Sequence, residues 1–125
     1  MRKTTPAECT TMADLRLQID RIDAELVALF AERVSFIDRA AEIKTGAGLP
    51  ARIAARVEDV VAKVRGHAVA HGLPPDRLEK MWRKLIDWSI EREEAVLGPD
   101  PQPDRDTTPG PGLGPGLGPD TAARQ

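Results

Sequence analysis

The feature that most constrains this chain is a long, uninterrupted stripe of apolar residues near its start. Between positions 12 and 45 apolar side chains recur at alternating spacings of four and three residues, without a Pro or Gly. The stripe positions are Leu15, Ile19, Ile22, Leu26, Leu29, position 33, Phe36, Ala40 and Ile43. This period is typical of one face of an α-helix. A helix of about 32 residues is roughly 48 Å long.

Two interruptions divide the rest of the chain. TGAGLP at 45–50 and HGLPP at 71–75 contain the Gly and Pro residues that end helices. The predicted fold is therefore all-α, with three helices per chain over roughly 12–45, 51–70 and 75–97 and a long first helix. Thr11 is placed to cap the first helix, with Asp14 three residues on. The expected core positions are Ile53, Val57, Val60, Val61, Val64 and Ala68 on the second helix and Leu78, Met81, Trp82, Leu85, Ile86 and Ile90 on the third.

Neither of the shorter helices is long enough to cover the apolar face of the first. Aromatic residues make up only 3% of the chain, so its own core is small. A second copy of the chain is the simplest source of additional apolar surface. We therefore expect a homodimer.

Composition excludes several other classes of partner. The net charge of −2 argues against nucleic acid and against an anionic membrane. No apolar run approaches the ~20 residues that a membrane span needs, and the first residues lack the apolar run of a secretory signal. We expect a cytoplasmic protein whose folded domain is 1–97. The Pro- and Gly-rich segment 98–125 is expected to be a disordered tail.

Charged residues on the apolar helix faces are the candidates for function. Arg33 interrupts the stripe of the first helix, and Lys44 lies three turns later on the same face, so both are expected in one cleft. Glu93 falls on the inner side of the third helix, and Arg56 borders the apolar face of the second. Buried salt bridges that set the register of the helices are one interpretation. The excess of cations favours another, a bound compact dicarboxylate.

Arg16 precedes Arg33 by 17 residues, or about 25 Å along the helix, too far to share a small ligand within one chain. In an antiparallel dimer it can approach the Lys44 end of the partner's first helix. A plain surface arginine is the alternative.

No cofactor or metal is expected. His67 and His71 have the spacing of a helical metal pair, but the sequence offers no third ligand. No Ser-His or Cys-His arrangement indicates a nucleophile, and the lone Cys9 has no adjacent base.

The segment DLRLQIDRIDAELVALFAERVSFIDRAAEIK resembles the long first helix of the all-helical chorismate mutases and the related isochorismate pyruvate lyases. The pattern is LR, then IDxxDxxLxxLxxxR, then a lysine. The matching residues are Arg16, Asp20, Asp23, Leu26, Leu29, Arg33 and Lys44. The resemblance continues through Pro50, Arg56, HGL at 71–73 and KLIDWSI at 84–90, so it covers roughly 5–97.

The resemblance implies an intertwined helical homodimer with two active sites, each completed by Arg16 of the other subunit. Arg33 corresponds to the arginine that holds a substrate carboxylate, and Lys44 to the lysine that contacts a carboxylate and the ether oxygen. By the same resemblance Arg56 and Ser89 are substrate-binding residues. Glu93 stands where the family commonly has a Gln that donates a hydrogen bond to the ether oxygen.

The implied activity is the rearrangement of chorismate to prephenate in aromatic amino acid biosynthesis, with Arg33, Lys44 and Glu93 as catalytic residues. Ile53 and Val57 occupy positions where chorismate mutases often have acids near the ring hydroxyl. The alternatives are therefore an isochorismate pyruvate lyase that forms salicylate and pyruvate, a mutase for an amino-substituted chorismate, and a non-catalytic helical dimer that binds a metabolite or a partner protein.

Overall fold

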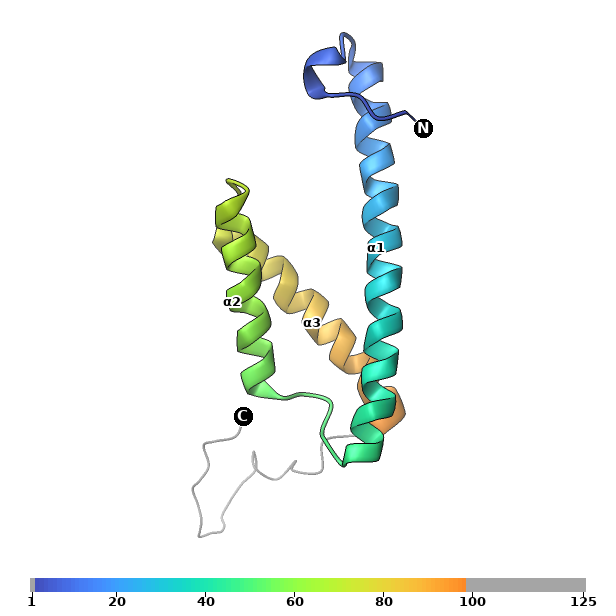
Figure 1. Ribbon diagram of the computed structural model, residues 1–125, viewed down its shortest axis with the longest axis vertical. Helices are drawn as coiled ribbons and strands as arrows, with labels where there is room; N and C mark the ends of the chain where they lie inside the picture. The colour runs from blue at the N-terminus through green and yellow to red at the C-terminus, as the bar shows by residue number, and fades with distance from the viewer. Residues whose placement is uncertain (1, 99–125) are drawn as a thin grey trace. The chain divides into compact units, whose positions relative to one another are not determined.

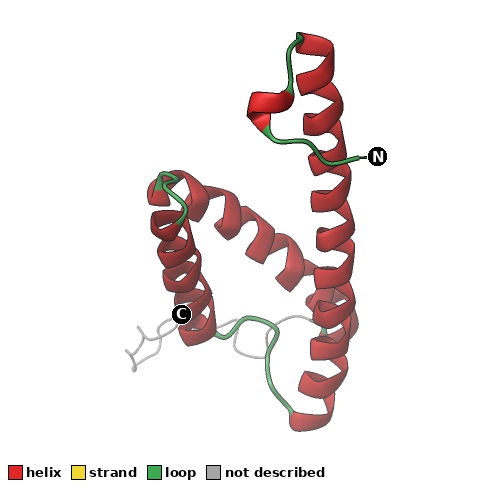
Figure 2. Cartoon of the chain, turned by 45° about the horizontal axis from the view of Figure 1, so that its top comes forward, coloured by secondary structure: helices red, strands yellow, loops and turns green. Residues whose placement is uncertain are grey.

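The computed structural model describes residues 2–98 and contains one 3-10 helix and three α-helices. They are η1 (Pro6–Glu8), α1 (Met12–Ala47), α2 (Ala54–Ala70) and α3 (Pro75–Leu97), shown in Figure 1. Figure 2 shows only helices and loops over the described residues, so the predicted all-α fold with a long first helix is confirmed. The predicted disordered tail, apart from Gly98, lies outside the described residues.

The chain consists of two compact units, Met1–Phe36 and Ile37–Gln125, with the boundary inside α1. In the first unit a reciprocal pair of bonds caps α1. The Asp14 N–H donates to Thr11 Oγ1 over 3.0 Å, and the Thr11 N–H donates to Asp14 Oδ2 over 3.2 Å. Hydrogen bonds, foremost from the Thr10 backbone, hold the pKa of Asp14 below its ordinary value. The predicted N-terminal cap of α1 is confirmed.

A short N-terminal segment, which the helical pattern did not predict, folds back along the first turns of α1. Gln18 fastens it, because its Nε2 donates to the Arg2 carbonyl over 2.9 Å and its Oε1 accepts from the Thr4 N–H over 3.4 Å. Arg21 Nε donates to the same Gln18 oxygen over 2.9 Å. The side chain of Gln18 therefore orders both the segment and one face of α1.

Most of the apolar stripe of α1 is exposed in a single chain. Ile19 is 53% exposed, Leu29 59% and Phe36 68%, and no residue of 2–36 is buried. Ala41 is the one buried residue of α1. Burial of an exposed Leu or Phe side chain is worth about 1.5–3 kcal/mol, so this face leaves a large stabilisation unused.

In the second unit α2 and α3 lie side by side and run in opposite directions (Figure 1). Their inner faces form the core, whose buried residues are Ala51, Val57, Val61, Ile86 and Ile90. Val60 and Trp82 pack against this cluster. The predicted apolar faces of both helices are confirmed apart from Met81, which is 54% exposed.

The ends of α1 and α2 share one geometry. After α1, the Leu49 N–H donates to the Lys44 carbonyl over 2.9 Å, and after α2 the Leu73 N–H donates to the Ala68 carbonyl over 2.8 Å. These bonds require a left-handed residue just beyond each helix, which Gly48 (φ 69°) and Gly72 (φ 72°) supply.

Two helix boundaries differ slightly from the approximate ones predicted. α1 continues to Ala47 instead of 45, because Gly46 is tolerated within a helix and the left-handed turn falls at Gly48. α2 begins at Ala54 instead of 51, because Ile53 is extended (φ −119°) and its carbonyl accepts the first helical bonds.

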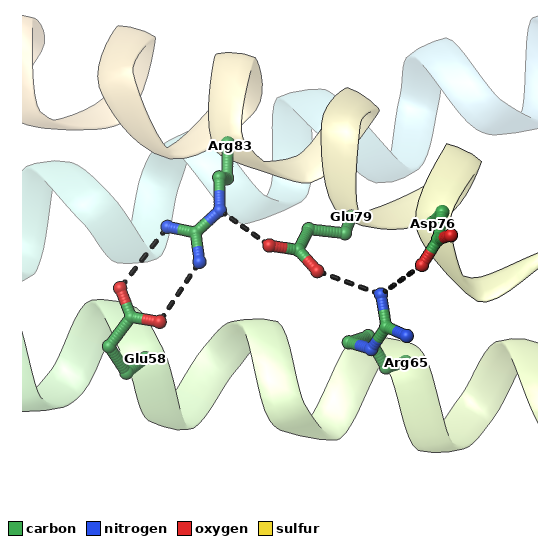
Figure 3. Close-up of polar contacts among 5 residues, drawn as sticks. All are labelled: Glu58, Arg65, Asp76, Glu79 and Arg83. Carbon is green, nitrogen blue, oxygen red and sulfur yellow. Dashed lines mark hydrogen bonds and ion pairs between the residues drawn. The ribbon is translucent and has the colours of Figure 1, made fainter.

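Five charged side chains of alternating sign link the outer edges of α2 and α3 (Figure 3). Arg83 contacts both oxygens of Glu58 (2.9 and 3.1 Å) and also Glu79 (2.8 Å). Arg65 contacts Glu79 (2.8 Å) and Asp76 (2.9 Å). The hydrogen bonds with Glu58, followed by those with Glu79, raise the pKa of Arg83.

This network predicts loss of stability in acid. Hydrogen bonds, foremost from Arg83, lower the pKa of Glu79 from 4.5, so near that pH the folded state binds fewer protons than the unfolded state. Its contribution is present above that value and is lost as pH falls. We expect Glu79→Gln to be less stable than wild type at neutral pH and to lose less stability on acidification, measured by urea unfolding across the acid range.

Glu42→Gln is the matched control, since Glu42 pairs with Arg39 within α1 and links no two helices. Wild type and Glu79→Gln with parallel acid profiles would contradict this role of the network.

Candidate functional site

Lys44, near the end of α1, is held between two oxygen acceptors. Its Nζ donates to Oε1 of Glu93 and to the carbonyl of Ala51, each over 2.6 Å. The Lys44 side chain is 18% exposed and that of Glu93 only 5%. A charge pair that is this enclosed is poorly hydrated, so each partner depends on the other for its stability.

Local structure explains this arrangement. The turn at Gly48 reverses the chain after α1, so that the Ala51 carbonyl of the next loop returns to the Lys44 side chain. On α3, Ser89 and Glu93 lie four residues apart on the inner face and are both buried. Ser89 Oγ donates to the Leu85 carbonyl over 2.9 Å. The predicted inner position of Glu93 is confirmed.

The other predicted cations lie on α1 and α2. Arg56 is exposed on α2, where its guanidinium pairs with Asp59 over 2.6 Å. Arg33 is partly buried and Arg16 exposed, and both belong to the Met1–Phe36 unit. A common cleft for Arg33 and Lys44 stays a prediction, as do the substrate-binding roles of Arg16, Arg56 and Ser89.

A second ionic contact near Lys44 was missed in the sequence. Arg92 Nε and Nη2 donate to the two carboxylate oxygens of Asp38, both over 2.9 Å, and thus join α3 to α1. These hydrogen bonds lower the pKa of Asp38. The two residues are 54 positions apart, so periodicity within one helix cannot reveal the pair.

A pocket of about 140 Å³ lies near the turn between α2 and α3, away from Lys44, and is lined by Val64, His67, Ala68, His71, Leu73, Leu78 and Trp82. Its wall is largely apolar. Among residues 2–98 no three His, Cys, Asp or Glu side chains gather in a way that could hold a metal ion. Within the same residues no helix is both long and apolar enough to cross a membrane.

The Lys44 site combines a cation with a carboxyl group. Lys44 donates to two protein oxygens, and either can be replaced by an oxygen acceptor of a ligand. Glu93 accepts hydrogen bonds when ionised and can donate one only when protonated. This arrangement is suited to binding an anion and to stabilising charge on an oxygen.

Comparison with known proteins places this geometry in context. Residues 15–94 match the family described as chorismate mutase type II. The chain is 31% identical over 90 residues to the isochorismate pyruvate lyase of Pseudomonas aeruginosa. The aligned region covers 71% of this chain and 87% of the lyase.

Two larger proteins also match. The T-protein of Enterobacter agglomerans is 34% identical over 87 residues, covering 70% of this chain but 22% of that protein. The bifunctional chorismate mutase/prephenate dehydratase of Aquifex aeolicus is 33% identical over 95 residues, covering 70% of this chain and 26% of its own length.

The buried charge pair predicts a strongly non-additive response to mutation. Lys44→Met leaves the buried Glu93 carboxyl without its cation, and we expect a loss of about 3 kcal/mol in unfolding free energy. The double variant Lys44→Met, Glu93→Leu removes both charges and should recover most of that loss. Urea unfolding at neutral pH measures both values. A double variant no more stable than the single one would contradict the pairing.

Proposed function

The chain belongs to the chorismate mutase type II family, and we propose that it catalyses the rearrangement of chorismate to prephenate. The observation that supports this most directly is the Lys44 ammonium, held 2.6 Å from the buried carboxyl of Glu93. The proposed role of the protein is a step in aromatic amino acid biosynthesis.

The rearrangement is unimolecular and needs no nucleophile and no cofactor. An enzyme accelerates such a step by holding the substrate in its compact reactive conformation and by stabilising charge on the breaking ether bond. In the proposed site Lys44 donates to the ether oxygen and to a carboxylate, while protonated Glu93 donates to the ether oxygen. Arg33 holds a carboxylate by a two-pronged contact, which fixes orientation as well as position.

Arg56, Ser89 and Arg16 complete the proposed pocket, with Arg16 supplied by a second copy of the chain. The uncovered apolar face of α1 supports this dimer, since Ile19, Leu29 and Phe36 are all more than half exposed in one chain. An identical subunit provides a matching face of the same length. The proposed assembly is an intertwined homodimer with two sites. The cytoplasmic location stays a prediction.

An isochorismate pyruvate lyase is the second candidate. The relative of that name in Pseudomonas aeruginosa is matched over 87% of its length, unlike the two larger relatives. Ile53 and Val57 are apolar, so neither side chain can bind a ring hydroxyl as an acid would. Val57 is part of the apolar core, and Ile53 is partly buried. Elimination of pyruvate from isochorismate can use the same cations.

One assay separates the candidates. The purified protein is mixed separately with chorismate and with isochorismate, and the products are identified. We expect prephenate from chorismate. Salicylate and pyruvate from isochorismate, without prephenate, would make the protein a lyase. Binding of either compound without turnover would favour a non-catalytic dimer.

The assigned cations predict large losses of activity. Arg33→Ala and Lys44→Ala should each lower kcat/KM on the order of a hundredfold or more under conditions in which circular dichroism shows the variants to be folded. Lys63→Ala is the control, because Lys63 is exposed on α2 and pairs with Asp59. Near-normal turnover by Arg33→Ala or Lys44→Ala would refute its assignment.

The contribution of Arg16 across the dimer predicts complementation. Arg16→Ala and Lys44→Ala are each expected to be inactive alone. When they are unfolded together and refolded as an equal mixture, half of the dimers are mixed and one of their two sites is intact, so about a quarter of wild-type activity should return. Failure to recover activity, with mixed dimers demonstrated, would place Arg16 outside the partner's site.

A further inference from the structure

The last turns of α1 contribute no residue to the buried core cluster of the second unit. The buried core cluster consists of residues of α2 and α3 together with Ala51 of the loop. Within α1, only the small side chain of Ala41 is buried. Asp38, Ala41 and Lys44 follow one another at spacings of three and so lie along one face of the helix. On α3, both Asp38 and Lys44 contact charged side chains.

Two ionic contacts join this face to α3. One is the pair of Lys44 with Glu93 over 2.6 Å, and the other is the two-pronged pair of Asp38 with Arg92, with both bonds at 2.9 Å. Arg92 and Glu93 are adjacent on α3. Asp38 and Lys44 are six residues apart on α1, or about 9 Å along its axis.

The two pairs constrain the helices to different degrees. A lysine is a point charge on a flexible four-carbon stem, so Lys44 can follow Glu93 over a range of helix positions. A guanidinium and a carboxylate that share two parallel hydrogen bonds must remain coplanar, so the pair of Asp38 and Arg92 fixes both distance and rotation. A ligand that accepts hydrogen bonds from Lys44 competes with Glu93 for the N–H groups of Lys44. The pair of Asp38 and Arg92 is not affected by this competition.

We infer that Asp38 and Arg92 are positioning residues, and that their two-pronged contact sets the register of α1 against α3 and thereby holds Lys44 at its working distance from Glu93. The kinetic consequence rests on the proposed function, but the geometric consequence does not. Neither residue touches the reacting atoms in this proposal.

Two variants remove the contact with little change in size. Asp38→Asn keeps the shape but removes the charge, and Arg92→Lys keeps the charge but removes the fork. Because small displacements of catalytic groups are costly, we expect each variant to lower kcat by about tenfold or more, with KM changed by less than about threefold. The reversed double variant, Asp38→Arg with Arg92→Asp, should recover part of the lost kcat.

The chain offers a matched control in the fork between Arg83 of α3 and Glu58 of α2. It also has two prongs, of 2.9 and 3.1 Å, and its arginine is 41% exposed compared with 44% for Arg92. Glu58→Gln matches Asp38→Asn, and Arg83→Lys matches Arg92→Lys except that it also loses the bond of Arg83 Nε to Glu79. Both controls should leave kcat within about twofold. An equal fall in kcat in these controls would show that general stability, not positioning, is responsible, and would overturn the inference.

A second measurement does not depend on activity. In protein with nitrogen-15 in its lysine side chains, the ammonium of Lys44 should give a slowly exchanging signal, which Lys44→Arg identifies by removing it. Asp38→Asn and Arg92→Lys should shift or broaden this signal, and the controls should not. An unchanged Lys44 signal in both variants would overturn the inference. If wild type acts on neither chorismate nor isochorismate, the proposed function fails while this comparison still decides the positioning.

Discussion

The charge on Lys44 imposes the strictest requirement in the second unit. An ammonium that is 18% exposed must replace lost water with protein oxygens, and here it does so with the Ala51 carbonyl and the Glu93 carboxyl. These two oxygens come from the loop after α1 and from the inner face of α3. The turn at Gly48, the extended residues before α2 and the packing of α3 on α2 all contribute to bringing them together.

In the second unit, different contacts hold the helices together and form the candidate site. Apolar contacts hold α2 against α3, and a network of five charged residues ties their outer edges. Two ion pairs, Lys44 with Glu93 and Asp38 with Arg92, join the end of α1 to α3. Apolar packing tolerates small adjustments of position, whereas hydrogen bonds between charged groups are sensitive to both distance and angle. This division suits a proposed reaction in which catalysis consists of holding and orienting a dianion.

Much of this architecture follows from short-range sequence patterns. Thr11 and Asp14 mark the start of α1, the 3.6-residue period identifies the core faces of α2 and α3, and the position of Glu93 on such a face predicts its burial. Each of these inferences needs only residues within one helix. Local structure alone is enough to determine them.

The features that the sequence did not reveal depend on contacts between distant segments or on which of several nearby partners a charged side chain chooses. The pair of Asp38 and Arg92 joins two helices whose relative register no single-helix pattern contains. Gln18 binds a segment without helical period. Arg56 was expected at the border of a core face, yet in the single chain it reaches the nearby carboxylate of Asp59. A flexible arginine on a helix commonly selects an acid one turn away, and the period cannot show that choice.

The uncovered face of α1 has a consequence for how such a protein behaves in dilute solution. Where a second subunit covers that face, association and folding draw on the same apolar surface, and their free energies cannot be measured separately. Dilution then shifts the equilibrium toward unfolded monomers, because the apolar stripe loses the subunit that covers it. The melting temperature of such a dimer depends on its concentration as well as on its sequence.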